Sequence, residues 1–579
     1  MKMINNIVHP GFVMMGFSLL IALMPSKAKG GLSILGACCA AAAGLTLSDS
    51  ARMTYAISKN FSIELMKVDD LTRAFLFAFC IISILIALYS YQLTSKTEAG
   101  VAAFYAGCVM SVVLAGDCLS FLIFWELSAV ASSYLIYARQ SRESSRAAFR
   151  YMLVHALGGN ILLVGIMLHI YHRGMEIVNI SQGPHDASFW LILIGLGINA
   201  AIPPLNSWLT DAYPVASMCG TVYLGSFTTK AAIYALIRFL SGTEMLVWAG
   251  CFMAIYAAAM AIMENDIARL LCYHIVSQLG MMIAALGTGS PLGIDGASAH
   301  AVTNIMFKGV LLMCTGSIVY GTGKRKITEL GGLAKKMPVT STCFLISSLA
   351  IAGLPLLSGF ASKGLIMESL AEGQYTIPEL LISAAGVGTL LSITLKINWF
   401  VFFGPSDLDV PIIRKQSYSM DSAVIIGTLI SVIFGTFPKI LYRFTMYHSD
   451  FDPFTLSHVM EYLAIFLGGS IPFFLYIKKM KPHDEFTIDF DWFYRKPLKA
   501  LFNGIASVLF LIGRWFDVNS LKAVHRLSSC IGDPEQITGR SHVAVIRSMS
   551  FENEDRRIGT VIGEAVGTVI ILWIVLAFM

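Results

Sequence analysis

The chain has 579 residues, of which 56% are hydrophobic and only 13% carry a charge. Soluble domains average about 25% charged residues, and the mean hydropathy of this chain is +0.70. This balance excludes a soluble enzyme, an intrinsically disordered chain and a secreted disulfide scaffold. The formal net charge of +5 is small for the length and gives no signature of nucleic-acid binding.

Apolar segments follow one another along most of the chain. They run for roughly 18 to 25 residues, the length that crosses a bilayer core about 30 Å thick. Their continuous hydrophobicity excludes a β-barrel, whose strands alternate. The sequence therefore predicts an all-α polytopic membrane protein with spans at 9–25, 31–48, 72–92, 99–115, 117–138, 149–171, 188–209, 217–240, 246–264, 267–288, 295–320, 339–372, 377–404, 420–440, 458–478 and 557–578.

Basic residues set the predicted orientation. They gather in loops after odd-numbered spans, as in Arg139 to Arg150, Lys324 to Lys336 and Lys478 to Lys481. Because cytoplasmic loops carry the excess of Lys and Arg, these loops are expected inside and the N-terminus outside. Met1 to Pro25 has no cleavage motif and is interpreted as the first span. We expect a multi-pass protein of the inner (cytoplasmic) membrane.

Two predicted spans contain helix breakers five spans apart. The segment around Pro203 and Pro204 interrupts the seventh span, and Pro355 with Gly359 interrupts the twelfth. Five is odd, so a five-helix unit that repeats must reverse its orientation, a layout typical of ion transporters. We expect about 14 core helices with two inverted five-helix repeats, each with a broken fourth helix.

This layout predicts five regions along the chain. They are N-terminal helices at 1–96, a first repeat at 97–241, a second repeat at 242–405, helices 14–15 at 406–480, and a C-terminal amphipathic segment with a final span at 481–579. Residues 497–516 are long enough to span, but their Trp/Phe/Leu content and the arginines that follow favour a helix lying in the cytoplasmic membrane interface.

Ionisable residues at membrane depth are functional candidates because burying them costs several kcal/mol. A row of such groups, linked by water at broken helices, can relay protons. Snorkelling to the surface for Lys396 and simple packing for His274 stay open as alternatives. The candidates are Glu126, Lys230, His274, His300, Lys308, Lys363 and Lys396.

Soluble-type chemistry is not expected. The sequence has no Walker loop, no nucleotide fingerprint and no Cys/His cluster with metal spacing. The 11 cysteines include no CxxC and are interpreted as buried free thiols. We therefore expect no cofactor and no metal.

Several motifs in this order resemble the antiporter-like subunits shared by Mrp-type sodium/proton antiporters and the membrane arm of respiratory complex I. The resemblance covers roughly residues 70–405. YHIVSQ and the later DFDWFYRK favour the D-type branch of the Mrp subunits. The motifs are FWELSA around Glu126, PPLNSWLTDAYPVAS, NDIARLLCYHIVSQLG, HAVTNIMFKGVLLMCTGSIVYGTG, ELGGLAKKMP and AGLPLLSGFASK.

The resemblance implies a proton path through Glu126, the span-seven and span-eight sites, His300, Lys308 and Lys363. The chain departs from the family pattern at three positions. Asn199 replaces a lysine of span seven, Asn304 replaces a second histidine of span eleven, and Gly364 stands where an acidic residue often follows the lysine of span twelve. Asn199 removes the usual partner of Glu126, and we expect Lys230 to take that role.

These observations predict a membrane component of a multisubunit antiporter that moves protons, with sodium as the expected coupled ion, and that is not itself an enzyme. Its partners would be other integral membrane subunits and the lipid bilayer. A proton-pumping subunit of an NADH:quinone oxidoreductase or a membrane-bound hydrogenase is the alternative. A third hypothesis, based on Asn199, is a scaffold subunit that has lost transport.

The predicted position of residues 497–516 is testable by labelling. With that segment on the cytoplasmic face, a cysteine placed at Ser520 should react with a membrane-impermeant thiol reagent only when the reagent has access to the cytoplasm. Labelling from outside intact cells would show instead that the segment spans the bilayer.

Overall fold

The computed structural model describes residues 8–48, 50–59, 61–405, 408–477, 482, 489–493, 496–497 and 499–531. The chain divides into two compact units, Met1–Arg495 and Lys496–Met579. In the part of the second unit that is described, α20 (Lys499–Ile531) forms one helix. It includes most of the segment predicted to lie in the membrane interface. The predicted span at 557–578 lies outside the described residues.

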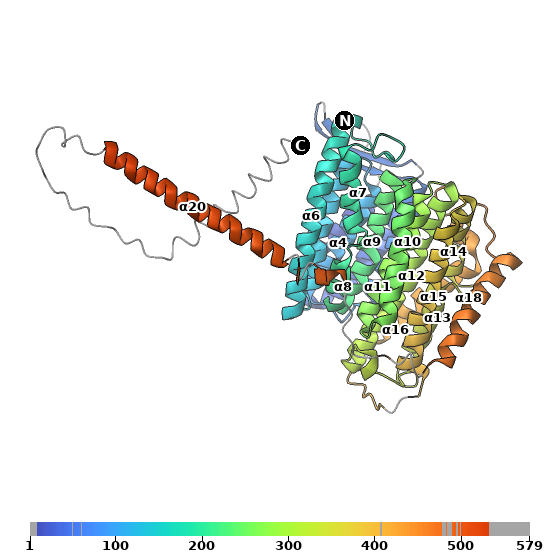
Figure 1. Ribbon diagram of the computed structural model, residues 1–579. Coiled ribbons are helices and arrows are strands. Elements are labelled where there is room, and N and C mark those ends of the chain that lie inside the picture. Colours follow the sequence, from blue (N-terminus) through green and yellow to red (C-terminus); the bar gives the residue numbers. More distant parts are fainter. Residues whose placement is uncertain are drawn as a thin grey trace, which may run out of the picture. The chain divides into compact units, whose positions relative to one another are not determined.

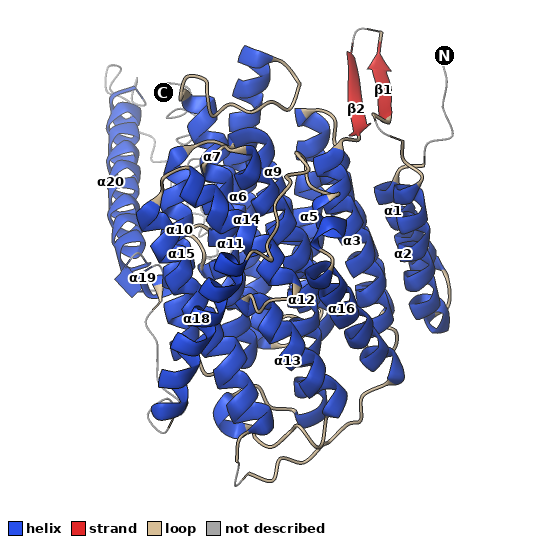
Figure 2. Cartoon of the chain, turned by 90° about the vertical axis from the view of Figure 1, so that its right-hand side faces the viewer, coloured by secondary structure: helices blue, strands red, loops and turns tan. Residues whose placement is uncertain are grey.

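The first unit is a bundle of helices with one β-hairpin, which Figure 2 shows beyond the helix ends, close to α1. Strands β1 and β2 pair antiparallel and were not predicted. The N-terminal elements are α1 (Pro10–Leu23), α2 (Lys29–Leu45), β1 (Arg52–Ser58), β2 (Phe61–Lys67) and α3 (Asp70–Tyr89).

The following helices extend from the left edge of the bundle in Figure 1, where α6 lies, to its middle, where α12 lies. They are α4 (Lys96–Leu114), α5 (Cys118–Tyr137), α6 (Arg142–Arg173), α7 (Ala187–Asn199), α8 (Ser207–Ala212), α9 (Met218–Leu240), α10 (Glu244–Met263), α11 (Ile267–Gly287) and α12 (Pro291–Thr322).

The last elements of this unit are α13 (Pro338–Ala352), α14 (Ser358–Glu372), α15 (Thr376–Thr389), the π-helical segment η4 (Leu390–Phe403), α16 (Tyr418–Thr436), α17 (Pro438–Tyr442), α18 (Leu456–Leu475) and α19 (Phe490–Phe493). Every predicted span up to 458–478 coincides with a helix or a pair of helices. Of the described helices, 11 are long and apolar enough to cross a membrane, and α1, α7 and α13 are shorter apolar helices. The predicted all-α membrane fold is confirmed.

The two predicted repeats share several features. Their third helices, α6 and α12, each have 32 residues. In each half, the aspartate that caps the second helix also forms a β-bridge with a residue just beyond the third helix: Asp117 bridges Glu176, and Asp266 bridges Lys326. The fourth helix is broken in both halves, as α7–α8 and as α13–α14. The region boundaries drawn from the sequence stay predictions.

Both breaks are stabilised by specific contacts. At the first break, the Trp208 indole Nε1 donates to Ile198 O at 2.9 Å and satisfies a carbonyl near the end of α7. At the second break, Gly353 takes φ +92° and ends α13 in a left-handed conformation. A Cβ at Gly359 would lie 1.9 Å from Ala350 O, so only glycine lets α14 start this close to α13.

An ion pair at one end of the bundle ties α3 to α9. The Asp69 carboxylate caps α3 and accepts from Arg238 at 2.5 Å, and Arg238 also donates to Thr72. Burial raises the pKa of Asp69, but the hydrogen bond and charge of Arg238 outweigh burial and hold that pKa below its ordinary value.

Helices α11 and α12 are buried almost throughout and form the centre of the bundle. Glycines allow α10 to approach α11 closely. A Cβ at Gly250 would lie 2.4 Å from Gly280 O, and a Cβ at Gly280 would lie 2.5 Å from Gly250 O. The contacting atoms are backbone, so no side-chain movement can relieve a clash. This crossing fixes the position of the central helix.

Replacing Gly280 should therefore destabilise the bundle. We expect Gly280→Val to lower the thermal unfolding midpoint in detergent and the abundance in membranes, because overpacking costs about 1–3 kcal/mol. Gly468→Val is the matched control, since a Cβ at Gly468 meets nothing within 4 Å. Equal midpoints for the two variants would contradict the close crossing of α10 and α11.

Candidate ion-translocation site

A polar stripe runs along one face of α12. His300, Asn304 and Lys308 are four residues apart, so they lie one above the other on the helix. Each is at most 1% exposed. Helices α3, α9, α11, α13, α14 and α16 surround α12. The stripe is therefore enclosed by protein on all sides and does not face lipid.

His300 is held between two helices. Its Nε2 lies 3.0 Å from Gln278 Oε1 of α11, and its Nδ1 lies 2.9 Å from Ser362 Oγ of α14. An amide oxygen only accepts, so Nε2 is the donor to Gln278. Ser362 Oγ in turn lies 3.0 Å from Thr303 Oγ1. The imidazole can gain or lose the Nδ1 proton while this network stays in place.

The next two residues of the stripe have no such partners. Asn304 Nδ2 and Oδ1 and Lys308 Nζ are buried and have no hydrogen-bond partner among the described residues. Leaving buried polar groups unpaired costs several kcal/mol, and internal water is the usual partner for such groups. This stretch of α12 is therefore a place where water would be bound next to a titratable amine.

His274 on α11 lies among the lysines of the second half. Its Nε2 is 2.7 Å from Ser392 Oγ. The single Ser392 proton goes to Gly388 O at 2.5 Å, so His274 donates to Ser392. The other ring nitrogen, Nδ1, is buried and unpartnered within the described residues. The charges of Lys308, Lys363 and Lys396 all act on this ring. The role of His274 stays a prediction.

Two of these lysines are held by carbonyls at helix ends. Lys363 Nζ donates to Ile351 O at 2.6 Å, at the end of α13. Lys396 Nζ donates to Ile262 O and Glu264 O, each at 2.7 Å, at the end of α10. The carbonyl end of a helix carries partial negative charge. Lys396 is only 6% exposed, and its amine lies at the end of α10.

The expected pairing of Lys230 with Glu126 is wrong. Lys230 is fully buried on α9, and its Nζ donates to Gly225 O of the same helix at 2.8 Å. Its charge acts on Lys308 and His300 of the stripe. The sequence showed that Lys230 lies at membrane depth but not which neighbouring helix it faces. The structure turns it toward α12.

Glu126 lies at the edge of the bundle instead. Its carboxylate packs on α6 at Gly159, where a Cβ would lie 2.2 Å from Oε1. Oε1 is buried and has no hydrogen-bond partner among the described residues. The neighbouring α5 side chains Ile123, Leu127 and Val130 are exposed. Glu126 is thus a half-buried carboxylate beneath an apolar outer face.

Asn199, at the end of α7, is 3% exposed, and its Nδ2 donates to Gly195 O at 3.1 Å. With His155 and Thr228 it lines a cavity of about 10 Å³ between α5, α6, α7 and α9. A cavity of this size holds at most one water. The first half therefore contains a small polar pocket but, among its described residues, no chain of charged groups like that of the second half.

A cavity of about 460 Å³ opens on the predicted cytoplasmic side, where α4 and α9 begin and α5 and α12 end. Glu98, Arg139 and Arg414 are among its lining residues. Glu98 is only 6% exposed and accepts from Ser217 Oγ at 2.5 Å. A neighbouring cavity of about 40 Å³ reaches Thr315, whose buried Oγ1 is unpartnered within the described residues.

Several polar residues of this site escaped prediction. Gln278 and Ser362 bind His300, and Ser392 binds His274. Gln278 follows His274 by four residues on the same helix face, a usable signal. Ser362 and Ser392 carry no such signal, because serine is common in membrane helices. Glu98 has the spacing of a capping box after Ser95, which conceals its contact with α9.

The middle of the chain matches a known family. Residues 115–392 match the family described as "NADH:quinone oxidoreductase/Mrp antiporter, TM". The chain is 30% identical over 374 residues to a probable A/B-type component of a K(+)/H(+) antiporter of Rhizobium meliloti, covering 60% of this chain and 37% of that protein. It is 25% identical over 395 residues to the D-type component of a Na(+)/H(+) antiporter of Bacillus subtilis. That match covers 64% of this chain and 80% of the relative.

Solved structures share the fold. A chain of the Mrp complex from Dietzia sp. superposes with a TM-score of 0.67 at 20% identity, covering 79% of this chain and 98% of that chain. A chain of respiratory complex I from Thermus thermophilus superposes with a TM-score of 0.68 at 19% identity. The superposition covers 79% of this chain and 99% of that chain. The resemblance to antiporter-like subunits is confirmed, although this chain spans only about half of an A-type Na(+)/H(+) antiporter relative such as that of Alkalihalophilus pseudofirmus.

The position of Lys230 predicts which residues couple energetically. Residues that share a network show non-additive effects of about 0.5–3 kcal/mol, while distant residues add. We expect Lys230→Met and Lys308→Met to be non-additive in the free energy of unfolding. Lys230→Met and Glu126→Gln should be additive. Thermal unfolding in detergent measures both cycles, and coupling of Lys230 to Glu126 alone would contradict this geometry.

Proposed function

We propose that this chain is the proton-translocating subunit of a multisubunit monovalent cation/proton antiporter in the cytoplasmic membrane. The observation that carries this proposal is the row of buried, titratable side chains in the second half. The family match and the named antiporter relatives support the same class of function. The ion exchanged for protons is a monovalent cation, with sodium as the first candidate, and the other subunits are integral membrane proteins.

The proposed path begins at the cytoplasmic cavity beside Glu98. From there it follows α12, because Thr315 lies two turns from Lys308 on nearly the same helix face, a rise of about 10 Å. Three polar groups along this face have no hydrogen-bond partner among the described residues: the Thr315 hydroxyl, the Lys308 amine and the Asn304 amide. They offer successive binding points for water. Protons then pass between Lys308 and the His274 and His300 networks, and on to Lys363.

The lysines suit this role because, among the described residues, no carboxylate contacts the amines of Lys230, Lys308 and Lys363. Lys230 and Lys308 repel each other, which disfavours simultaneous charging of these two amines. A proton on one lysine therefore favours its release from a neighbour. Backbone carbonyls at the helix breaks stabilise the charged form of a lysine amine but do not hold the amine permanently charged.

The two asparagines have different consequences, Asn304 in the second half and Asn199 in the first. Asn304 cannot titrate but can orient water, so it does not interrupt the path along α12. In the first half, Asn199 leaves Glu126 without a nearby cation among the described residues. We infer that the second half carries the proton path and that Glu126 acts where this chain meets another, beneath the exposed face of α5.

A respiratory role is the second candidate, because chains of complex I share this fold as closely as that of the Mrp complex. The two differ in their partners. Purification of the native complex from its membrane distinguishes them: small antiporter subunits favour the first proposal, whereas quinone-binding and iron–sulfur subunits favour the second.

Proton flux through the purified complex in vesicles tests the proposal. Lys308→Met removes the amine and keeps most of the side-chain volume, so we expect loss of cation-driven proton movement at unchanged membrane abundance. Lys335→Met is the control, since Lys335 is exposed in the loop after α12. Normal flux in the Lys308 variant would contradict the proposed path, and absent flux in the parent complex would favour a scaffold role.

A further inference from the structure

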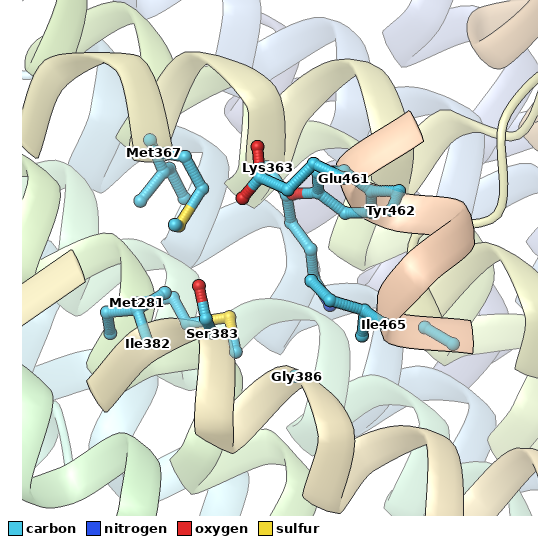
Figure 3. Close-up of a pocket in the computed structure, with 11 residues that line it drawn as sticks. Met281, Lys363, Met367, Ile382, Ser383, Gly386, Glu461, Tyr462 and Ile465 are labelled. Atoms are coloured by element: carbon cyan, nitrogen blue, oxygen red, sulfur yellow. The ribbon is translucent and has the colours of Figure 1, made fainter. Parts of the chain in front are cut away.

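A cavity of about 20 Å³ lies beside the second helix break, with room for about one water. Lys363 of α14 and Glu461 of α18 both line it, together with Tyr462, Met281, Met367 and Ser383. Figure 3 shows Lys363 with the α18 residues Glu461 and Tyr462 on one side of the cavity and Met281 and Ser383 on the other. Two ionisable side chains therefore line one cavity of about the size of a water molecule.

Helix α18 fits tightly against this break. A Cβ at Gly364 would lie 2.6 Å from His458 Nε2, and a Cβ at Gly353 would lie 2.8 Å from the Tyr462 ring. Gly364, directly after the buried Lys363, thus has no side chain and leaves room for α18. The absence of both side chains is what brings Glu461 to the cavity that Lys363 lines.

Glu461 also reaches the surface. Its side chain is 45% exposed, whereas that of His458, which lies 3.8 Å away and one turn earlier, is 11% exposed. The other charged groups that act on Glu461 are Glu368 of α14 and Glu379 of α15. Glu461 therefore lies between the cavity that Lys363 also lines and an acidic surface region. In the predicted topology this surface is the outer one, because α14 ends and α18 begins outside.

We propose that Glu461 is a proton-transfer residue that connects Lys363 to the outer surface through the water-sized cavity. In one direction, the Lys363 ammonium gives a proton to water while that water gives one to the Glu461 carboxylate. This leaves a neutral amine and a neutral carboxylic acid, so charge and protons balance. Glu461 then releases its proton outside. His458 beside it stabilises the carboxylate when the imidazole is protonated.

This inference rests on the proposed function, so the test has one readout that does not need transport. The Glu461→Cys variant of the purified complex, in vesicles with the outer face exposed, is alkylated either with iodoacetate or with iodoacetamide. The two adducts have nearly the same size, but only the iodoacetate adduct regains a carboxylic acid. The extent of alkylation reports water access, and proton flux reports function. The parent complex treated with each reagent controls for native cysteines.

We expect the Glu461→Cys and Glu461→Gln variants to reduce proton flux at least tenfold, since positioned proton donors contribute about 10²–10⁴-fold. Iodoacetate should restore flux to the cysteine variant, and iodoacetamide should not. Glu372→Gln, at the exposed end of α14, is the matched control and should keep normal flux.

Equal flux with both adducts in an active complex would overturn the role of Glu461, as would normal flux in Glu461→Gln. Failure of the cysteine to react would show that water does not reach this position and would also overturn the proposal. Absent flux in the parent complex would instead overturn the proposed function itself, whatever the extent of alkylation.

Discussion

In this fold, lysines are buried at membrane depth and, among the described residues, no carboxylate contacts their amines. An unpaired charge at this depth costs several kcal/mol, so the fold must supply other partners. It does so with backbone carbonyls at helix ends, Ile351 O for Lys363 and Ile262 O for Lys396. The broken helix in the second half exposes the carbonyl that Lys363 uses. Lys308, which has neither kind of partner among the described residues, depends on water.

The same constraint explains why the two halves differ. In the second half, α11 and α12 are enclosed by other helices, so charges and water are shielded from lipid. In the first half, α5 and α6 form an outer face, and Glu126 lies just beneath it. A neutral Asn199 is tolerable there because it satisfies its own amide by donating to Gly195 O. The two halves thus share backbone features, such as third helices of equal length, but differ in the polar groups that they bury.

Hydropathy and spacing predicted much of this molecule. Continuous apolar runs located the helices, because length and composition suffice for a membrane span. The interval of four residues placed His300, Asn304 and Lys308 on one face correctly. The direction of Lys230 was not predictable, because its neighbour depends on how α9 packs. Glu461 was missed for a similar reason: it lies on α18, far along the chain from Lys363, and a glutamate in the first turns of a helix resembles an ordinary terminal residue.

We infer that water joins the titratable groups of the second half into one path. A high-resolution structure of the native complex would make ordered water visible beside these side chains. We expect water bound to Lys308 Nζ and Asn304, continuing toward Thr315 on one side and His274 on the other. A dry, tightly closed α12 stripe would contradict it, as would a carboxylate from another protein of the complex bound to Lys308.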